Sequence, residues 1–366
     1  MKNFDAFLKR KNICFSARRY GIDALSAMAQ GLFCSLLIGT IIKTLGEQLG
    51  LGFLVDVGGY ASAMSGAAMA VAIGFALQAP PPVLFSLATV GYAANALGST
   101  TLIPDQPGAG GPLAVLFIAI IAAECGKAVS KETRIDILVT PLTTILVGVG
   151  LSAWWAPSIG TAATAVGSLI MWATDLQPFL MGIVVSVLVG VALTLPISSA
   201  AICAAFSLTG LAGGAAVAGC CANMVGFAVL SFRENGWGGL VSQGLGTSML
   251  QMGNIMKNPR IWLPAILTSA VTGPIATCVF HLEMNGPPVS SGMGTCGLVG
   301  QIGVWTGWLS PSPQALANGA AAITPGAMDW LGLVLISFVL PAALCWAFGL
   351  LFRRAGWIGD GDLTLQ

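Results

Sequence analysis

Residues 210–230 read GLAGGAAVAGCCANMVGFAVL, a run that contains no charged side chain. A bilayer core of about 30 Å needs about 20 apolar residues in a helix that rises about 1.5 Å per residue, so this run is long enough to cross it. Small residues recur at every fourth position of the run, at Gly210, Gly214, Ala218 and Ala222. Such a stripe lets neighbouring helices approach closely, so the run predicts a tightly packed membrane helix.

Runs of similar length recur along the chain. Of its 366 residues, 56% are hydrophobic and 8% are charged, whereas soluble domains carry about 25% charged residues. A membrane barrel would instead show short segments of alternating polarity. The sequence therefore predicts an all-α, polytopic membrane helical bundle.

Basic residues gather in four regions, and the positive-inside rule places each region on the cytoplasmic side. These regions are residues 2–19, 127–134, 233–260 and 353–354. The apolar runs between them lie near 22–42, 62–78, 80–98, 112–126, 137–155, 176–195, 210–231, 261–280 and 328–351, with an outer loop at 99–111. About ten spans and two cytoplasmic termini are expected.

The course of residues 157–173 is open on this evidence. The even number of crossings required between Arg134 and Arg233 is reached if 157–173 crosses, or if residues 197–231 hold two short helices. The segment 157–173 is also short enough to lie in the membrane interface as a connecting helix.

Two further segments, 236–256 and 286–308, are apolar but are interrupted by glycine and carry hydroxyl and amide side chains at their centres. The first lies between basic flanks on one side of the membrane, and the second lies between spans on the opposite side. Irregular backbone at membrane depth is tolerated only where protein or a water-filled cavity surrounds it. Each segment therefore predicts a re-entrant hairpin.

The two segments share a short repeat, GLGTS at 244–248 and GMGTC at 292–296. Glycines leave peptide groups uncovered, and threonine and serine hydroxyls both donate and accept hydrogen bonds. A pair of interrupted segments that enter from opposite faces indicates a transporter site near the membrane midplane. The alternative is a pair of flexible glycine kinks without a ligand.

The polar side chains of these segments, and of the link before the second one, are the candidate substrate-binding residues. They are Gln243, Thr247, Ser248, Asn254, His281, Glu283, Asn285, Ser290, Ser291, Thr295 and Gln301. His281 and Glu283 would converge only if the chain unwinds there, and they would then bind sugar hydroxyls or relay a proton. The alternative is a hydrated pair at the outer surface.

Several classes of function are excluded by what the chain lacks. Its net charge of +1 offers no large basic field, so no nucleic-acid partner is expected. It has no phosphate-binding loop and no dinucleotide fingerprint, and its single histidine cannot form a metal-binding pair. We therefore expect no catalytic residues, no metal site and no cofactor.

The run SQGLGTSMLQMGNIMKNPRIWLPAILTSAVTGPIAT at 242–277, followed by GPPVSSGMGTCGLVGQIG at 286–303, carries a resemblance to a known family. It resembles the integral-membrane EIIC family of the bacterial phosphotransferase system, in the variant that includes PfoR-type toxin regulators. The resemblance implies a multi-pass protein of the bacterial cytoplasmic (inner) membrane. It also implies a homodimer whose interface is the N-terminal half, 1–155, joined by an amphipathic linker helix, 156–175, to a transport half, 176–366.

The expected function is transport of a small polar solute, a sugar or a related metabolite, by alternating access of the elevator type. Because no domain with a phosphorylated cysteine or histidine is fused, phosphotransfer would need separate partner proteins. The alternative is a membrane sensor or regulator that binds a ligand without transport. An ion channel is disfavoured, because the sequence has no charged ring and no carbonyl-filter repeat.

Overall fold

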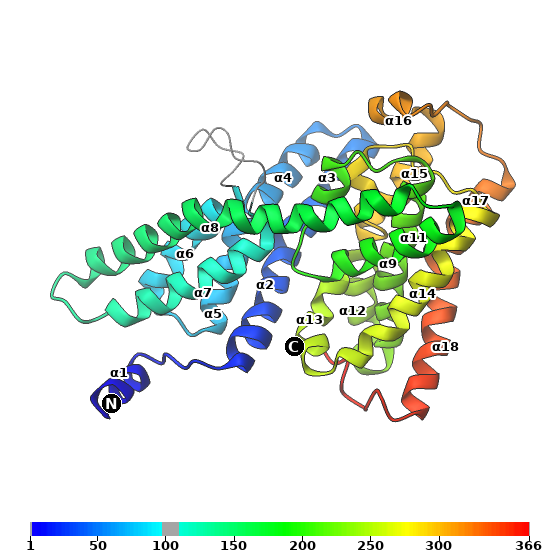
Figure 1. The fold of residues 1–366 in the computed structure, drawn as a ribbon. Coiled ribbons are helices and arrows are strands. Elements are labelled where there is room, and N and C mark those ends of the chain that lie inside the picture. The colour runs from blue at the N-terminus through cyan, green and yellow to red at the C-terminus, as the bar shows by residue number, and fades with distance from the viewer. Residues whose placement is uncertain (1, 97–109, 366) are drawn as a thin grey trace. The chain divides into compact units, whose positions relative to one another are not determined.

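The computed structural model describes residues 2–96 and 110–365, and within these ranges every element with more than a single bridge is helical (Figure 1). One isolated antiparallel bridge joins Gly210 to Met284. The all-α prediction is confirmed. Residues 99–109 of the expected outer loop lie outside the described residues.

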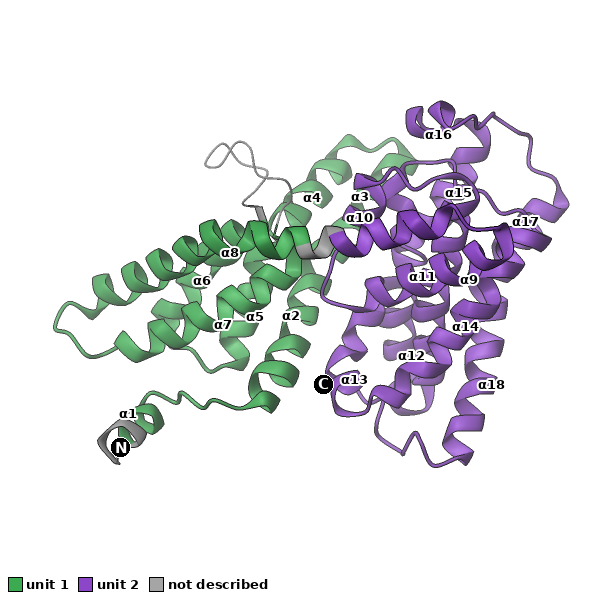
Figure 2. Ribbon diagram, viewed as in Figure 1, with its two compact units in different colours: residues 1–164 green, residues 165–366 purple. Residues whose placement is uncertain are grey.

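The chain forms two compact units, residues 1–164 and 165–366 (Figure 2). The division falls within α8, which runs from Asp136 to Thr174 without a break. Residues 157–173 are thus the second half of one long helix, and Pro157 does not end it, although a proline inside a helix removes a hydrogen bond. The boundary lies within 156–175, whose role as a linker remains a prediction.

Unit 1 consists of α-helices with two π-helical turns in its first apolar run. Its elements are α1 (Lys2–Arg10), η1 (Arg19–Asp23), α2 (Ala24–Leu32), η2 (Phe33–Leu37), α3 (Ile38–Leu49), α4 (Gly52–Ala63), α5 (Ser65–Ala76), α6 (Pro81–Ala96), α7 (Gly111–Val129) and the first part of α8. Helices α5 and α6 pack closely because Gly66 and Gly91 have no side chains. A Cβ on either glycine would overlap the carbonyl of the other.

Unit 2 combines long helices with short interrupted ones. Its elements after α8 are α9 (Pro178–Thr194), α10 (Ser199–Ala205), α11 (Gly210–Leu230), α12 (Phe232–Val241), η3 (Ser242–Gly246), η4 (Ser248–Gln251), α13 (Met252–Lys257), η5 (Pro259–Trp262), α14 (Leu263–Pro274), η6 (Ile275–Val279), η7 (Pro288–Gly292), η8 (Cys296–Leu298), α15 (Val299–Leu309), α16 (Pro313–Ala317), α17 (Ala327–Val334), η9 (Leu335–Val339) and α18 (Leu340–Arg354).

Helix α11 is the centre of unit 2 and is 94% buried over its apolar window. Helices α9, α14 and α18 pack around it (Figure 1). Its glycines make this possible: a Cβ on Gly214 would overlap the Leu282 carbonyl oxygen, and a Cβ on Gly219 would overlap the Ser186 carbonyl oxygen. The prediction of close packing by small residues is confirmed for this helix.

Six helical stretches in the described residues are long and apolar enough to cross a membrane. They are Arg19–Leu49, Gly111–Val129, Asp136–Thr174, Gly210–Leu230, Pro259–Val279 and Ala327–Arg354. The pair α4 and α5, bent by 47°, raises this number to seven, and α9 is a shorter apolar helix. The multi-pass character is confirmed, and the expected count of about ten spans remains a prediction.

Candidate functional site

The first interrupted segment, residues 236–256, folds back on itself. The chain is helical through η3, becomes extended at Thr247 (φ −158°, ψ 144°) and returns through η4 and α13. Across the fold, Gln251 Nε2 donates to Gln243 Oε1 at 2.9 Å, so the two arms lie side by side. The glycine-threonine motif at 244–248 therefore forms the turn.

The second interrupted segment, residues 286–308, also folds back. A Cβ on Gly307 would overlap the backbone nitrogen of Gly286, which shows that the outgoing and returning arms are in contact. At the turn Gly294 has φ +53°, and a Cβ there would lie 2.6 Å from Cys220 Cβ. This position requires glycine both for its backbone conformation and for its close approach to α11.

The two turns meet. The Thr295 hydroxyl donates to the Gly244 carbonyl oxygen at 2.5 Å and contacts Met224 Sδ at 3.6 Å. Helix α11 forms the wall beneath both turns, since Gly294 packs against Cys220 and the α-carbon of Gly244 faces Ala228. The structure thus brings both copies of the repeated motif to one place in the interior of unit 2.

A buried polar cluster around Asn223 holds the first turn, and we call it the Asn223 cluster. Ser248 Oγ lies 2.8 Å from Thr194 Oγ1, and Thr194 Oγ1 lies 3.3 Å from Asn223 Oδ1. Asn223 also donates to Ser269 Oγ at 3.2 Å and accepts from Trp262 Nε1 at 3.0 Å. The sequence signal for this cluster is the lone amide of Asn223 in an otherwise apolar helix, whereas Thr194, Ser269 and Trp262 carried no such signal.

The C-terminal residues hold the base of the first hairpin. Gln251 Nε2 donates to the Leu363 carbonyl oxygen and Asn254 Nδ2 to that of Thr364, each at 2.9 Å. Gln243 Nε2 donates to Ser231 Oγ at 2.7 Å. The amides of Gln243 and Asn254, two candidate binding residues, are therefore engaged within the protein.

Serine hydroxyls join the second hairpin to its neighbours, Ser291 from the hairpin itself and Ser199 from α10. Ser291 Oγ donates to the Leu208 carbonyl oxygen at 2.6 Å, and Ser199 Oγ donates to that of Gly292 at 2.8 Å. Ser290 is buried beside Gly303. Repair of carbonyls exposed by a helix break is a common role for serine, and these contacts fix the hairpin against its neighbours.

Gln301 retains unused hydrogen-bonding capacity. Its Nε2 donates to Cys221 Sγ at 3.2 Å, while its Oε1 is buried and has no partner among the described residues. Ser337 Oγ is also buried and lies beside the same thiol. Because an unpaired buried polar atom costs about 1–3 kcal/mol, this region can gain from a hydroxyl-bearing ligand.

His281 and Glu283 lie where the chain unwinds. Unwinding is the condition under which the sequence predicts that the two side chains converge. Both side chains are exposed, and no hydrogen bond or ion pair between them is found in the described structure. Instead, Glu283 Oε2 accepts from Asn285 Nδ2 at 2.8 Å, and Asn285 Oδ1 is buried without a partner in the described residues. The structure thus brings Glu283 to Asn285 rather than to His281.

At the meeting point of the two turns, the described residues supply hydroxyls, amides, thiols and peptide groups but no charged side chain. Such groups can bind the hydroxyls of a neutral polar solute and cannot by themselves supply a strong acid or base. Among the described residues, no cluster of three histidine, cysteine or carboxylate side chains is arranged to hold a metal ion.

A comparison with protein-family models finds one described as "Phosphotransferase system, EIIC", which matches residues 22–365. The match includes both units and both interrupted segments. Searches of curated proteins and of solved structures found no match.

Proposed function

The chain belongs to the EIIC family of the phosphotransferase system, and from this premise we propose that unit 2 binds and carries a sugar or a related small polar metabolite. The chain is a membrane transport component of that system and not itself a catalyst, since other proteins of the system perform the phosphotransfer. The substrate site, the route and the direction of movement are the parts that we propose.

The hydrogen bond between Thr295 and Gly244 is the observation that supports this proposal best. It joins two interrupted segments whose turns carry the same motif, in a neutral and partly buried environment. When the turns separate, the Gly244 carbonyl and the Thr295 hydroxyl lose each other as partners, and a sugar hydroxyl can replace both contacts. The described structure then corresponds to a closed state in which the two turns satisfy each other at Thr295 and Gly244.

Three of the candidate residues have the features expected of direct sugar contacts. Thr295 bridges the turns, and Gln301 and Asn285 each hold a buried oxygen without a partner in the described residues. Thr247, Ser248, Ser290 and Ser291 would shape the site through the turns that they hold. Gln243 and Asn254 would keep the first hairpin in place. His281 and Glu283 would lie at the entrance of the sugar site.

We further propose the arrangement expected for alternating access of the elevator type. Unit 1 would form the homodimer interface, residues 156–175 would link it to unit 2, and both hairpins would enter the membrane of a bacterial cell from opposite faces. Both termini would be cytoplasmic, where separate phosphotransfer proteins could reach the solute.

A sensor that binds a sugar without transporting it is the second candidate. The bonds from Gln251 and Asn254 to the C-terminal residues favour it, because they restrict the first hairpin. Saturable binding without uptake would identify this second function.

The full-length protein, purified and reconstituted in proteoliposomes, provides the test. A thermal-shift screen against neutral sugars should reveal stabilisation by at least one of them, because a ligand that binds only the folded state raises its stability. Labelled uptake of that sugar is then measured with and without the soluble phosphotransfer proteins.

Thr295→Val should weaken sugar binding about tenfold, as expected for one lost buried hydrogen bond. Thr306→Val is the matched control, since the Thr306 hydroxyl bonds only within its own helix, to Ile302 and Gly303 carbonyls. If no sugar binds saturably, or if both variants bind equally well, the proposed site is wrong.

A further inference from the structure

The N-terminal segment is fixed to unit 1 by a group of polar contacts at one end of its helices. Lys11 Nζ donates to the Ser130 carbonyl oxygen and pairs with Glu132 Oε1, which also pairs with Arg10 at 2.6 Å. Asn12 Nδ2 donates to Gln78 Oε1 at 2.5 Å. Residues 10–12 are thereby held against the turn that follows α5 and the turn that follows α7.

Lys127 forms the inner wall of this region and is 2% exposed. Its ammonium group donates to the carbonyl oxygens of Asn12 at 2.7 Å and Leu77 at 3.1 Å, and pairs with Glu124 at 2.9 Å. These three contacts use all three of its donors. Lys127 therefore holds the wall in place and contributes positive charge behind it.

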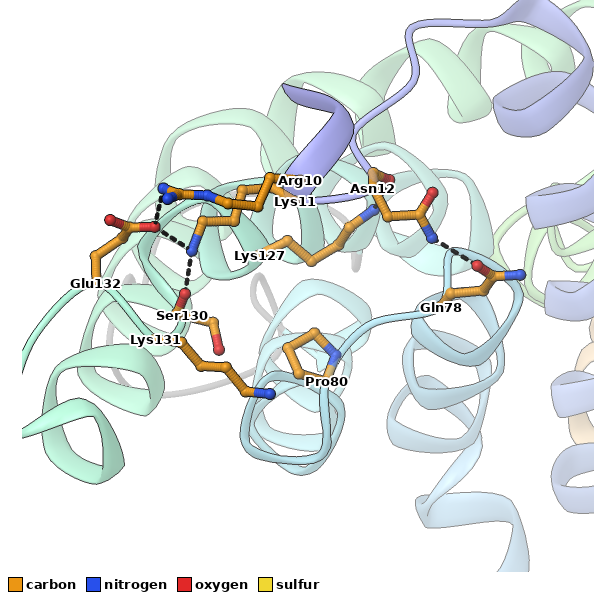
Figure 3. Close-up of a pocket in the computed structure, with 9 residues that line it drawn as sticks. All are labelled: Arg10, Lys11, Asn12, Gln78, Pro80, Lys127, Ser130, Lys131 and Glu132. Carbon is orange, nitrogen blue, oxygen red and sulfur yellow. Dashed lines mark hydrogen bonds and ion pairs between the residues drawn. The ribbon is translucent and has the colours of Figure 1, made fainter. Parts of the chain in front are cut away.

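A cavity of about 350 Å³ lies between these groups (Figure 3). Its lining residues are Arg10, Lys11, Asn12, Gln78, Pro80, Lys127, Ser130, Lys131 and Glu132. Four of them are cationic and one is a carboxylate. With Glu124, the partner of Lys127, included, the four cations exceed the carboxylates by two, although the protein as a whole carries a net charge of only +1.

Lys131 is a lining cation without an ion pair among the described residues, although its charge acts on the nearby Asp136. Its side chain forms no hydrogen bond or ion pair with the described residues; only its backbone nitrogen is bonded, to Asp136 Oδ1. Figure 3 shows the Lys131 side chain extending toward Pro80, on the wall across from Arg10 and Lys11. The ammonium group is available to a ligand in the cavity.

The backbone adds to the positive potential. Helix α6 begins at Pro81, directly after Pro80 in the cavity wall, and a helix N-terminus carries a partial positive charge. A second cavity of about 360 Å³ shares Asn12 and Gln78 with the first, and its charged lining residues are Arg18, Arg19 and Asp23. The excess of positive charge therefore continues along this end of unit 1.

We propose that the cavity binds a phosphate group, carried either by an anionic phospholipid or by a soluble phosphate ester. Arginine and lysine are the side chains best suited to phosphate, through charged hydrogen bonds that Lys131 and Arg10 can supply here. Basic clusters beside a membrane helix commonly bind anionic headgroups. Because the phosphate would sit in unit 1, this inference is independent of the proposed sugar site.

The surroundings favour the lipid as the source. Phe15, three residues after Asn12 in the sequence, is 75% exposed. The Phe7 ring lies 5.5 Å from the Arg10 guanidinium carbon. An aromatic side chain exposed beside a basic cluster is typical of a segment that lies at the membrane surface. A headgroup held in the cavity would leave its acyl chains near the Phe7 ring, which lies beside Arg10 and Lys11.

Native mass spectrometry of the full-length protein in detergent tests the proposal. The probes are short-chain phosphatidylglycerol, short-chain phosphatidylcholine and inorganic phosphate. We expect phosphatidylglycerol to bind more tightly than phosphatidylcholine, and Lys131→Gln and Arg10→Gln each to weaken its binding about fivefold, the contribution typical of one basic residue at an anionic membrane surface. Lys257→Gln, which removes an exposed lysine of unit 2, is the matched control and should bind like the unmodified chain.

The outcomes separate the two sources. Binding of phosphatidylglycerol that depends on Lys131 identifies a lipid site, and binding of inorganic phosphate alone that depends on Lys131 identifies a site for a soluble ester. Equal binding of phosphatidylglycerol and phosphatidylcholine without any phosphate binding overturns the proposal. So does an unchanged affinity in both cavity variants, or an equal loss in the Lys257 control. The Lys131 side chain has no hydrogen bond or ion pair among the described residues, and its backbone bond to Asp136 is kept in Lys131→Gln, so this substitution should leave the melting temperature unchanged.

Discussion

Ending the chain after Asp362 should release the base of the first hairpin. The removed residues accept hydrogen bonds from Asn235, Gln251 and Asn254 through the carbonyls of Leu363 and Thr364, and the Leu365 nitrogen donates to Asn235 Oδ1. The side chain of Leu363 is completely buried. The truncation thus removes four hydrogen bonds and one buried leucine.

The magnitude follows from these contacts. A buried neutral hydrogen bond contributes about 1 kcal/mol and a buried leucine side chain about 2 kcal/mol, which gives an upper bound of about 6 kcal/mol. Water would replace part of the lost hydrogen bonding, so we expect the free energy of opening the hairpin to fall by about 3 kcal/mol. This corresponds to a roughly hundredfold loss of protection from amide exchange.

Hydrogen-deuterium exchange followed by mass spectrometry measures this effect on peptides from residues 236–256, with peptides from α11 as an internal reference. Thr364→Ala is the matched control, because it keeps the backbone carbonyl that Asn254 uses and removes only the side chain. Unchanged exchange in the truncated protein would show that the C-terminal residues do not hold the hairpin. Equal loss in α11 would show general unfolding instead.

Three further perturbations test other parts of the structure. Gly214→Ala should prevent normal folding, because the new Cβ would overlap the Leu282 carbonyl, whereas Gly238→Ala, with open space around it, should leave the melting temperature within a few degrees of the unmodified protein. Lys127→Met should lower the stability of unit 1 by about 3–5 kcal/mol, because it leaves Glu124 without its buried ion pair. A melting temperature equal to that of Lys131→Met would contradict the predicted loss of stability. The hydrogen bond from Lys11 lowers the pKa of the exposed Glu132, so the contribution of Glu132 to holding the N-terminal segment should be complete above the ordinary glutamate pKa of about 4 and be lost as the pH falls through the lower folded-state pKa. The contacts of Lys11 with Ser130 and of Asn12 with Gln78 remain, so the attachment should weaken. Limited acid proteolysis should show this weakening, and Glu132→Gln should show it at every pH.

The fold was largely predictable, because long apolar runs and small-residue stripes are properties of local sequence. The run at 210–230 forms the buried helix α11, and the repeated motifs lie at turns that meet. The sequence predicts the runs at 137–155 and 157–173 as separate segments, yet they form one helix that contains Pro157. Proline weakens a helix only by a local amount, and the neighbouring turns can retain their bonds.

The candidate site was less predictable, because its contacts join residues far apart in the chain. The polar groups of Gln243 and Asn254 suggested a ligand, but Asn254 bonds to Thr364 and the Gln243 amide to Ser231. A local pattern contains no information about such partners. The unpaired oxygen atoms of Gln301 and Asn285 likewise became evident only from their surroundings.

The central claim, that the two turns together enclose one sugar, is tested most directly by amide exchange in the presence of the sugar that stabilises the protein most. The account predicts that peptides containing residues 244–248 and 292–296 change their exchange together, with the same dependence on sugar concentration, and that Thr295→Val shifts both responses to higher concentration. A response confined to one turn, or the absence of a response from either turn while the sugar is bound, would contradict it.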